Sequence, residues 1–557
     1  MVQSVMVNAF NQVPKAVIPR SVFNRGHGYK TTFSPDVLVP FLVDEVLPGD
    51  SFKVNAEFLL RFNDLLRPFM DNLYINTYYF YCPDRLVWEN FVRMMGEQDN
   101  PDDSTSYVFP KIELGAEQLT PDSIYCYMGM PMASQLQSGK KYRVMNLPFR
   151  MYNLIWNEWF RDQNLQNSLI VNKGDADDDP ALYKLRHIGK KQDYFTSCLP
   201  KPQKGPEPTL PIGGQAPVLT SSTQEVGYDA VSGQPGNWGL SFYSSEAGRL
   251  ADPTKLVGLN LGGQSGSAVG KSNSATLSAP FSLSASALGG MVAPANLFAD
   301  LSGATAITIN QMRELFAIQR LYERDMRGGT RYTEICQSHY GVINPDARLQ
   351  RPEFLGGSRQ RINVTSIPQT SSSTTASKQA NLAGYSATHG SSGFTKSFTE
   401  HGFIIGLICV TCDLTYQQGI DRFWFRDTRF DVYWPALSHL GEQAVLSQEI
   451  YADGSDDDKL VFGYQERYAE YRYKPSKITG VLNSKSPLPL DQWHLSQDFD
   501  NRPVLNDEFR ESHTPLDRVR ALNDGENTPP FLLDSFIDMR CARPMPVHGV
   551  PGLIDHF

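Results

Sequence analysis

A strict alternation of apolar and polar residues over 51–62 places the firmest constraint on how this chain can fold. Apolar residues occupy every second position and polar residues stand between them: Phe52, Val54, Ala56 and Phe58 against Ser51, Lys53, Asn55 and Glu57. A period of two predicts a β-strand with one buried face. Residues 73–82, LYINTYYFYC, have aromatic side chains on both faces and end at Pro83, which predicts a second strand buried between two layers.

Further strands are predicted late in the chain. Residues 403–416 are predicted to form a buried strand and include the most apolar run, 403–410. Residues 462–473 alternate less cleanly, as in a strand with one solvent-exposed face. Helices and strands do not alternate along the sequence, so a parallel α/β sheet is excluded. We therefore predict a mainly β fold, a sandwich of two antiparallel sheets. A jelly roll is the commonest such scaffold that tolerates large insertions.

A few helices are expected beside the strands. A short one is predicted at 86–95, and a longer one at 149–162, where Pro148 takes the first position and Trp156 and Trp159 are expected to anchor the core. A third is predicted at 309–327, with a capping box formed by Thr308 and Gln311. The remaining segments are predicted to be irregular: an extended arm at 1–35, a loop after Gly328-Gly329, a Ser/Thr-rich loop at 368–397 and the tail beyond Pro475.

Residues 206–303 differ in composition from the rest of the chain. They are rich in Gly, Ser, Ala and Thr and poor in charge, which is typical of a linker. They nevertheless contain spaced apolar residues, namely Leu259, Leu261, Val269, Leu277, Phe281, Leu283 and Leu288. We interpret this segment as an insertion that becomes ordered when copies pack together. It divides a parent fold into residues 1–205 and 304–557.

Charge and cysteine content limit the possible partners. The formal charge is −9, so contact with DNA is either confined to a local patch or left to a separate basic protein. The seven cysteines lack the spacing of a disulfide framework or zinc site and are expected to be reduced and structural. Cys409 and Cys412 should point to opposite faces of their strand. The start is not a signal peptide, and no apolar run is long enough to span a bilayer, so no membrane insertion is expected.

Motifs that resemble catalytic or ligand sites are incomplete. GSAVGKS at 266–272 has Ser265 where a phosphate-binding loop needs glycine. DADDD at 175–179 lacks the glycine and glutamate of a calcium loop, and both it and the acidic run at 455–458 are predicted to be solvated loops. Neither HExxH nor GxSxG occurs. We therefore predict no catalytic residue, no cofactor and no metal site.

An arginine-rich segment at 321–357 is the remaining candidate site. Its candidates are Arg327, Arg331, Arg348 and Arg351. One interpretation pairs them within the chain, with the carboxylates of Glu323, Asp325, Glu334, Asp346 and Glu353. The other places some of them at subunit contacts or facing a nucleic-acid interior.

Several blocks of sequence resemble a known family. They are KKQDYFTSCLPKPQKG at 190–205, ERDMRGGTRYTE at 323–334, PDARLQRPEFLGG at 345–357, FDVYWPALSHLGEQAVLSQEIY at 430–451, FGYQERYAEYRYKPSKITG at 462–480 and LDQWHLSQDF at 490–499. Together they resemble the major capsid protein (VP1 or F protein) of the Microviridae, in their gokushovirus branch. The resemblance covers most of the chain.

The resemblance carries expectations about structure and partners. It implies an eight-stranded jelly roll, and a T=1 icosahedral shell of about sixty copies around a circular single-stranded DNA phage genome. It implies a separate small basic DNA-packaging protein, a host-cell surface receptor, and protrusions at the three-fold axes, for which residues 206–303 are the candidate. The protein is expected in the virion, after synthesis in the bacterial host cytoplasm. The rival class is a β-sandwich spike that binds a receptor or carbohydrate.

Overall fold

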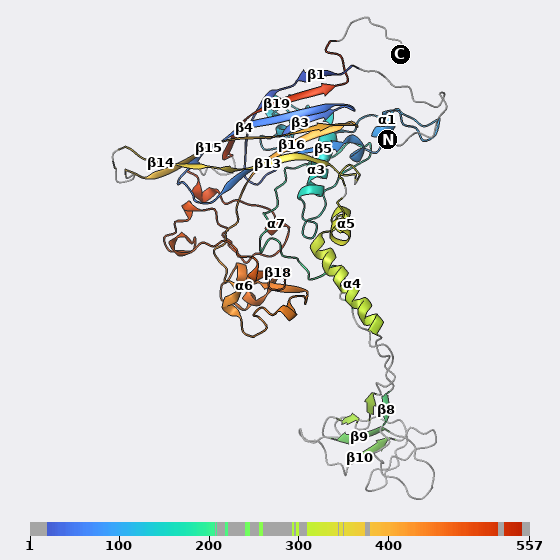
Figure 1. The fold of residues 1–557 in the computed structure, drawn as a ribbon, viewed down its shortest axis with the longest axis vertical. Helices are drawn as coiled ribbons and strands as arrows, with labels where there is room; N and C mark the ends of the chain where they lie inside the picture. The colour runs from blue at the N-terminus through green and yellow to red at the C-terminus, as the bar shows by residue number, and fades with distance from the viewer. Residues whose placement is uncertain are drawn as a thin grey trace. The chain divides into compact units, whose positions relative to one another are not determined.

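The computed structural model describes residues 19–206, 208, 309–343, 345–348, 350–371, 373, 379–521 and 529–548, with the backbone of five short strands between 218 and 299. The chain divides into two compact units. One comprises residues 1–205 and 322–557, and the other residues 206–321. The first unit contains the two largest sheets, the main core and nearly all of the arginine-rich segment (Figure 1).

Two antiparallel sheets dominate the first unit. The first sheet has the order β1 (Ser21–Asn24), β19 (Phe531–Arg543), β4 (Ser51–Leu65), β15 (Leu382–Ser397) and β14 (Val364–Pro368), with β2 (His27–Phe33) also paired to β19. The second has the order β13 (Glu353–Ile362), β5 (Leu73–Pro83), β16 (Gly402–Cys412) and β3 (Val39–Val46). Apart from β14 and β15, neighbours in each sheet are far apart in sequence. This crossing of connections between two sheets is the arrangement of a jelly-roll sandwich, as predicted.

The main core lies between the sheets. The apolar residues of β4 that alternate in the sequence are all buried, which confirms the predicted strand and its inner face. Tyr79 of β5 reaches across to β15, where its ring lies 5.3 Å from that of Phe394 and its hydroxyl is 2.9 Å from that of Ser392. The two sheets are therefore joined by ring packing and by a buried hydrogen bond.

A second hydrophobic cluster covers the other face of β5 and β16. Helix α3 (Leu147–Ile155) lies on this face (Figure 1), and Trp156 and Trp159 pack into the cluster, as predicted. Cys409 belongs to this cluster and Cys412 to the main core, so the two thiols point to opposite faces. All seven cysteines are free thiols. Both strands are thus buried on both sides, as the aromatic and apolar runs predicted.

Several predicted helices and strands end early. The helix predicted at 149–162 is α3, followed by a π-helical turn, η4 (Trp156–Phe160). The helix predicted at 86–95 is reduced to the turns η2 (Asp84–Leu86) and α1 (Phe91–Met94). The strand predicted at 462–473 is β18 (Val461–Glu466) only. It stops there because Tyr468 has a φ of 63°, a left-handed conformation that turns the chain out of the sheet.

Four segments predicted to be irregular contain regular structure. Part of the expected arm at 1–35 forms β1 and β2, and the tail beyond Pro475 contains β19. The Ser/Thr-rich loop predicted at 368–397 contains β15, one of the longest strands. Small residues suit its inner face, because a Cβ at Gly390 would lie 2.6 Å from the Phe58 ring. The loop predicted after Gly329 contains helix α5 (Tyr332–Tyr340).

The other elements are short, apart from α4 (Ile309–Gly328), which is the predicted helix at 309–327. In the first unit they are α2 (Ile124–Tyr127), α6 (Ser447–Ile450), α7 (Asp507–Arg510), β6 (Lys111–Leu114), β7 (Tyr142–Met145) and β17 (Glu442–Leu446). In the second unit they are β8 (Val218–Thr220), β9 (Leu240–Ser244), β10 (Leu256–Leu259), β11 (Val292–Pro294) and β12 (Leu297–Ala299). None of the described helices is long and apolar enough to cross a membrane.

The 3-10 turns beyond η2 connect these elements. They are η3 (Ala133–Gln135), η5 (Pro180–Leu182), η8 (Arg422–Phe425), η9 (Pro435–Leu437), η10 (Asp456–Lys459), η11 (Ala469–Tyr471), η12 (Gly480–Leu482), η13 (Asp491–Trp493) and η14 (Asp517–Val519).

The acidic runs are mostly exposed, as predicted, but each has one buried carboxylate. Asp178 is buried against α3, where it accepts hydrogen bonds from Arg150 at 2.7 and 3.0 Å. Asp458 is likewise buried and pairs with Arg502 at 2.9 Å. In both runs one carboxylate is buried because it forms an ion pair with a buried or half-buried arginine. Within the described ranges, no cluster of three or more His, Cys, Asp or Glu side chains suits a metal ion.

A buried carboxyl group just after β5 makes stability depend on pH. Burial, together with a smaller effect of the nearby Glu45 carboxylate, raises the pKa of Asp84 to about 7. In the unfolded chain the pKa is about 4, so the free energy of unfolding falls as the pH rises between these two values. We expect Asp84→Asn to raise the free energy of unfolding at pH 8 by on the order of 2 kcal/mol, with little effect at pH 4. Urea unfolding of the unassembled protein at both pH values measures this.

The exposed Asp534 on β19 provides the matched control for this measurement. Asp534→Asn should change stability little at either pH. An equal gain for Asp84→Asn at pH 4 and pH 8 would show that the ionisation of Asp84 is not the cause.

Candidate functional site

The arginine-rich segment begins where α4 ends. The helix stops at Gly328, and Gly329 follows with a φ of 89°, so the predicted left-handed end of the helix is confirmed. The chain then enters α5 and returns to β13. Two of the four candidate arginines, Arg331 and Arg351, pack against the π-helical turn that follows α3, as the contacts below show.

Arg331 ties the start of α5 to that turn. Its Nη2 donates to the carbonyl oxygens of Asn157 at 2.6 Å and Arg161 at 3.0 Å, and its Nη1 pairs with Glu334 at 3.1 Å. The Gln163 side chain strengthens the same junction, since it accepts from the Thr330 N–H at 2.7 Å and donates to Glu334 at 2.9 Å. Arg331 therefore satisfies carbonyl groups that the end of a helix leaves free.

Arg351 is held in a different way. Its Nη2 pairs with Asp346 at 2.7 Å, and its guanidinium lies 4.6 Å from the centre of the Trp159 ring. The indole N–H of Trp159 donates to the carbonyl oxygen of Pro352 at 3.0 Å. The tryptophan expected to anchor the core therefore also supports the cation, through stacking and a hydrogen bond to the neighbouring backbone.

The other two candidates are more exposed. Arg327 pairs with Glu442 of β17 and with Glu466 of β18, the latter at 3.2 Å. Arg348 is exposed, and among the described residues its guanidinium has no ion pair or hydrogen bond. Three of the candidates are thus paired within the chain, and Arg348 offers an open cation.

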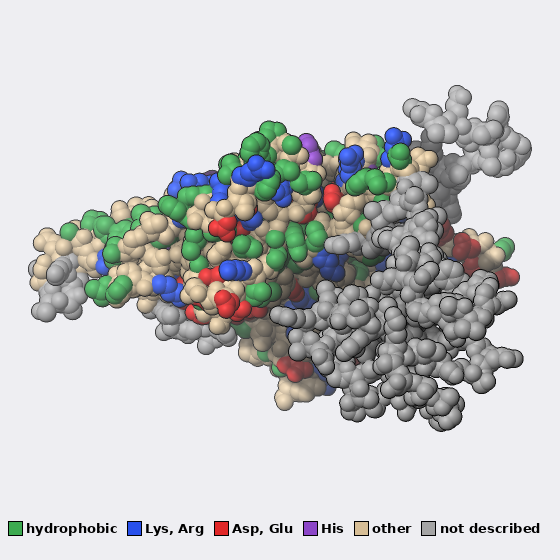
Figure 2. Space-filling view, turned by 90° about the horizontal axis from the view of Figure 1, so that it is seen from below, with side chains coloured by type: hydrophobic (Ala, Val, Ile, Leu, Met, Phe, Trp, Pro, Cys, Tyr) green, Lys and Arg blue, Asp and Glu red, His purple; other side chains and the backbone are tan. Residues whose placement is uncertain are grey.

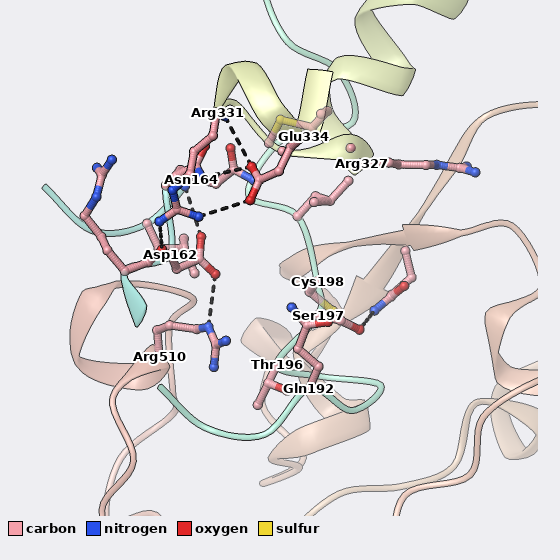
Figure 3. Close-up of a pocket in the computed structure, with 18 of the residues that line it drawn as sticks. Asp162, Asn164, Gln192, Thr196, Ser197, Cys198, Arg327, Arg331, Glu334 and Arg510 are labelled. Carbon is pink, nitrogen blue, oxygen red and sulfur yellow. Dashed lines mark hydrogen bonds and ion pairs between the residues drawn. The ribbon is translucent and has the colours of Figure 1, made fainter. Parts of the chain in front are cut away.

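A polar cavity of about 670 Å³ lies beside these residues (Figure 3). Four arginines and four carboxylates line it: Arg161, Arg327, Arg331, Arg510, Asp162, Glu334, Glu442 and Glu466. Arg510 pairs with Asp162 at 3.0 Å. The pKa of Arg161 is lowered, mainly by burial and to a smaller extent by the positive charge of Arg331. The equal numbers of charges leave little net attraction for a phosphate group.

Truncating Arg331 should loosen this junction, whereas truncating Arg348 should not. We expect Arg331→Ala to lower the free energy of unfolding by about 2 kcal/mol, because two carbonyl groups and Glu334 lose a charged donor. Arg348→Ala should change it by less than ~0.5 kcal/mol. Urea unfolding of both unassembled variants measures the difference. If the two variants had equal free energies of unfolding, the contacts of Arg331 would not stabilise the junction between α5 and the π-helical turn.

Sequence reasoning found the arginines but missed most of their partners. Glu334 and Asp346 were among the proposed carboxylates, but the pairing of Arg327 with Glu442 and Glu466 spans more than a hundred residues of chain. Other partners are uncharged: the backbone carbonyl of Asn157, the side-chain amide of Gln163 and the ring of Trp159. A pattern of charged residues in the sequence cannot predict such partners. Of the residues proposed for a protrusion, Leu259 lies in β10, and the other six lie outside the described residues.

Comparison with known proteins bears on what this scaffold is for. A sequence model of the family described as capsid protein (F protein) matches residues 11–553. The chain is 42% identical to the capsid protein VP1 of Chlamydia phage 1 and 42% identical to that of Bdellovibrio phage phiMH2K, in each case over 99% of this chain and 98% of the relative. It is 36% identical to the capsid protein VP1 of Spiroplasma virus 4, over 98% of each chain. On a match that runs along almost its whole length, this chain belongs to the capsid protein (F protein) family.

Proposed function

We propose that this protein is the repeating subunit of a T=1 icosahedral shell that encloses a circular single-stranded DNA phage genome. About sixty copies would form the closed shell, each making the same contacts by symmetry. The observation that carries the proposal is the similarity to three phage capsid proteins over nearly the whole of each chain. A rigid two-sheet sandwich suits a subunit whose role is structural and not catalytic.

The charge distribution favours a separate basic partner for the DNA. The chain carries a formal charge of −9, and basic, acidic and hydrophobic side chains are interspersed on the face shown in Figure 2. A surface of this kind does not neutralise a polyanion by itself. We therefore infer that a small basic DNA-packaging protein accompanies the genome. We infer that direct contact between this protein and the DNA is made by local cations such as Arg348, the candidate arginine that has no partner among the described residues.

The shell proposal is tested by expressing the protein and imaging the purified material by electron microscopy. Closed icosahedral particles of uniform size are the expected result. We infer that the protein is synthesised in the bacterial host cytoplasm and then resides in the virion. Small oligomers only, with the capsid's other components present, would instead favour a spike protein that binds a receptor or carbohydrate. Light scattering distinguishes the two outcomes, because a shell is many times heavier than a spike.

Residues 206–303 are proposed to form the protrusions at the three-fold axes and to meet the host-cell receptor. The support is their composition and their position in a unit of their own, residues 206–321. Deleting 220–300 should leave particles that close but lack protrusions, and infectivity should fall at least tenfold. Cryo-electron microscopy and plaque counts measure both. A truncated chain that cannot fold would show that the segment belongs to the core.

A further inference from the structure

A cluster of exposed aromatic side chains occupies the lobe built around β17 and β18. It lies on the segment 423–434 and on the turn after β18. We define the aromatic surface by six residues that are 47–73% exposed: Phe423, Trp424, Phe430, Tyr433, Trp434 and Tyr471. Exposed singly, such residues need no explanation, but pairs of exposed rings in contact on one lobe, Phe423 with Trp424 at 4.7 Å and Tyr433 with Tyr471 at 6.2 Å, mark an interaction site.

The size of the aromatic surface approaches that of a protein interface. An aromatic side chain buries roughly 200 Å² when fully covered, so six that are half exposed offer on the order of 600 Å². A stable protein–protein interface covers about 800 Å² on each partner. Val432, 48% exposed, lies in the same segment, and Leu440, 64% exposed, follows it shortly along the chain.

The surface is held rigid from beneath. The buried Tyr468 ring lies 5.2 Å from that of Tyr433, and the Tyr468 hydroxyl donates to the carbonyl oxygen of Phe430 at 3.2 Å. The indole N–H of Trp434 donates to the carbonyl oxygen of Arg429 at 2.7 Å. Tyr468 adopts its left-handed conformation at a cost of about 1–3 kcal/mol, which the surrounding contacts offset. A surface fixed in advance loses little entropy when a partner binds.

Two of the arginines beside the surface are neutralised within the chain. Arg422 pairs with Glu449 at 2.8 Å, and Arg426 pairs with Glu470 at 3.4 Å and lies over the Tyr471 ring. A platform that stacks the bases of single-stranded DNA is accompanied by a positively charged groove. Here Arg422 and Arg426 are paired with carboxylates, whereas the exposed Arg429 lies 4.8 Å from the centre of the Phe430 ring and has no ion pair among the described residues. The combination of aromatic residues with arginine is that of a protein–protein interface.

We propose that the aromatic surface is a contact between subunits, covered in the particle by a second copy of this chain. The inference rests on the proposed function, because a capsid subunit meets other copies over much of its surface. The occupant is a second copy because the surface is largely aromatic, close to interface size and rigid, and because Arg422 and Arg426 beside it are already paired within the chain. Trp424, 73% exposed, is the residue that gains most from being covered.

Trp424→Ala tests the inference with Trp424→Phe as its matched control. The only ring contact of Trp424 within the described residues is with Phe423, at 4.7 Å, so either variant should fold as stably as the parent. We expect the protein concentration needed for assembly to rise at least tenfold for Trp424→Ala and to change less than threefold for Trp424→Phe. Sedimentation separates particles from free subunits, and thermal unfolding of the free subunits checks the fold.

The outcomes separate this inference from the shell proposal. If the parent protein forms particles and Trp424→Ala assembles equally well, the contact is overturned and the shell proposal stands. If the parent forms no particles, both fall. A photo-crosslinking amino acid at position 424 should join two copies of the chain inside particles. Crosslinks to DNA in place of a second chain would overturn the contact and assign the surface to the genome.

Discussion

Replacing Arg150 with methionine is expected to lower the free energy of unfolding by about 3–5 kcal/mol, because it removes one partner of a fully buried ion pair. Arg150 and Asp178 are 0% and 1% exposed in their side chains. Arg150 also donates to the carbonyl oxygens of Val87, Gly174 and Ala176. Methionine fills a similar volume but donates nothing, so a carboxylate and three carbonyl groups lose a donor inside the protein.

Asp178 does not depend on Arg150 alone. Burial by itself would raise the pKa of Asp178, but hydrogen bonds from Arg150, Tyr183 and Asn172 outweigh it and lower the pKa. In the Arg150→Met variant, Tyr183 and Asn172 still donate to Asp178. The expected decrease in the free energy of unfolding therefore stays within the range for breaking a single buried ion pair.

Arg143→Met is the matched control, because Arg143 forms an exposed pair with the neighbouring Asp177, at 2.6 Å. An exposed pair contributes about 0–1 kcal/mol. Urea unfolding of unassembled protein, followed by tryptophan fluorescence, compares the two variants. If Arg150→Met were no less stable than Arg143→Met, the buried network would not be what fixes α3 and the acidic run.

Replacing Phe80 with alanine should lower the free energy of unfolding by a similar amount, about 3–5 kcal/mol, through the cavity it leaves. Phe80 is buried on β5, and its ring contacts those of Trp159, Phe160 and Phe354 at 5.5–5.9 Å. Trp159 in turn supports Arg351. The cavity should therefore also loosen the arginine-rich segment, with faster amide hydrogen exchange near Phe354.

Phe536→Ala provides the comparison, since Phe536 is 55% exposed on the outer face of β19. Losing an exposed ring should change stability by less than ~1 kcal/mol. Denaturant unfolding and hydrogen exchange measure both variants. Unchanged exchange around Phe354 in Phe80→Ala would mean that the arginine-rich segment is held independently of the core.

The sequence predicts the strands whose side chains carry a hydrophobic signal. β4 is found by its alternation, and β5 and β16 by apolar residues on both faces, because burial selects these residue types directly. β15 is missed because its inner face is built from small residues such as Gly390, which make room for large rings on β4. In such a strand the fit depends on the partner, which the local sequence does not contain.

The candidate site was predicted less completely than the core. The arginines stand out by charge, but whether each is paired depends on residues brought together by the fold, such as Glu442 and Glu466 beside Arg327. Helix α5 was missed for a related reason. Its side chains are at most partly buried, so it carries no strong apolar stripe to mark it. Local patterns predict elements, and long-range contacts decide what their polar residues do.

The position of β19 between β2 and β4 bears on how the chain folds during synthesis. β2 and β4 are made within the first 65 residues, but the strand that joins them arrives only at residues 531–543. At translation rates of 5–20 residues per second, the first sheet stays split for on the order of a minute. A nascent chain therefore has no finished sandwich, and a subunit able to tile a shell exists only once translation is nearly over.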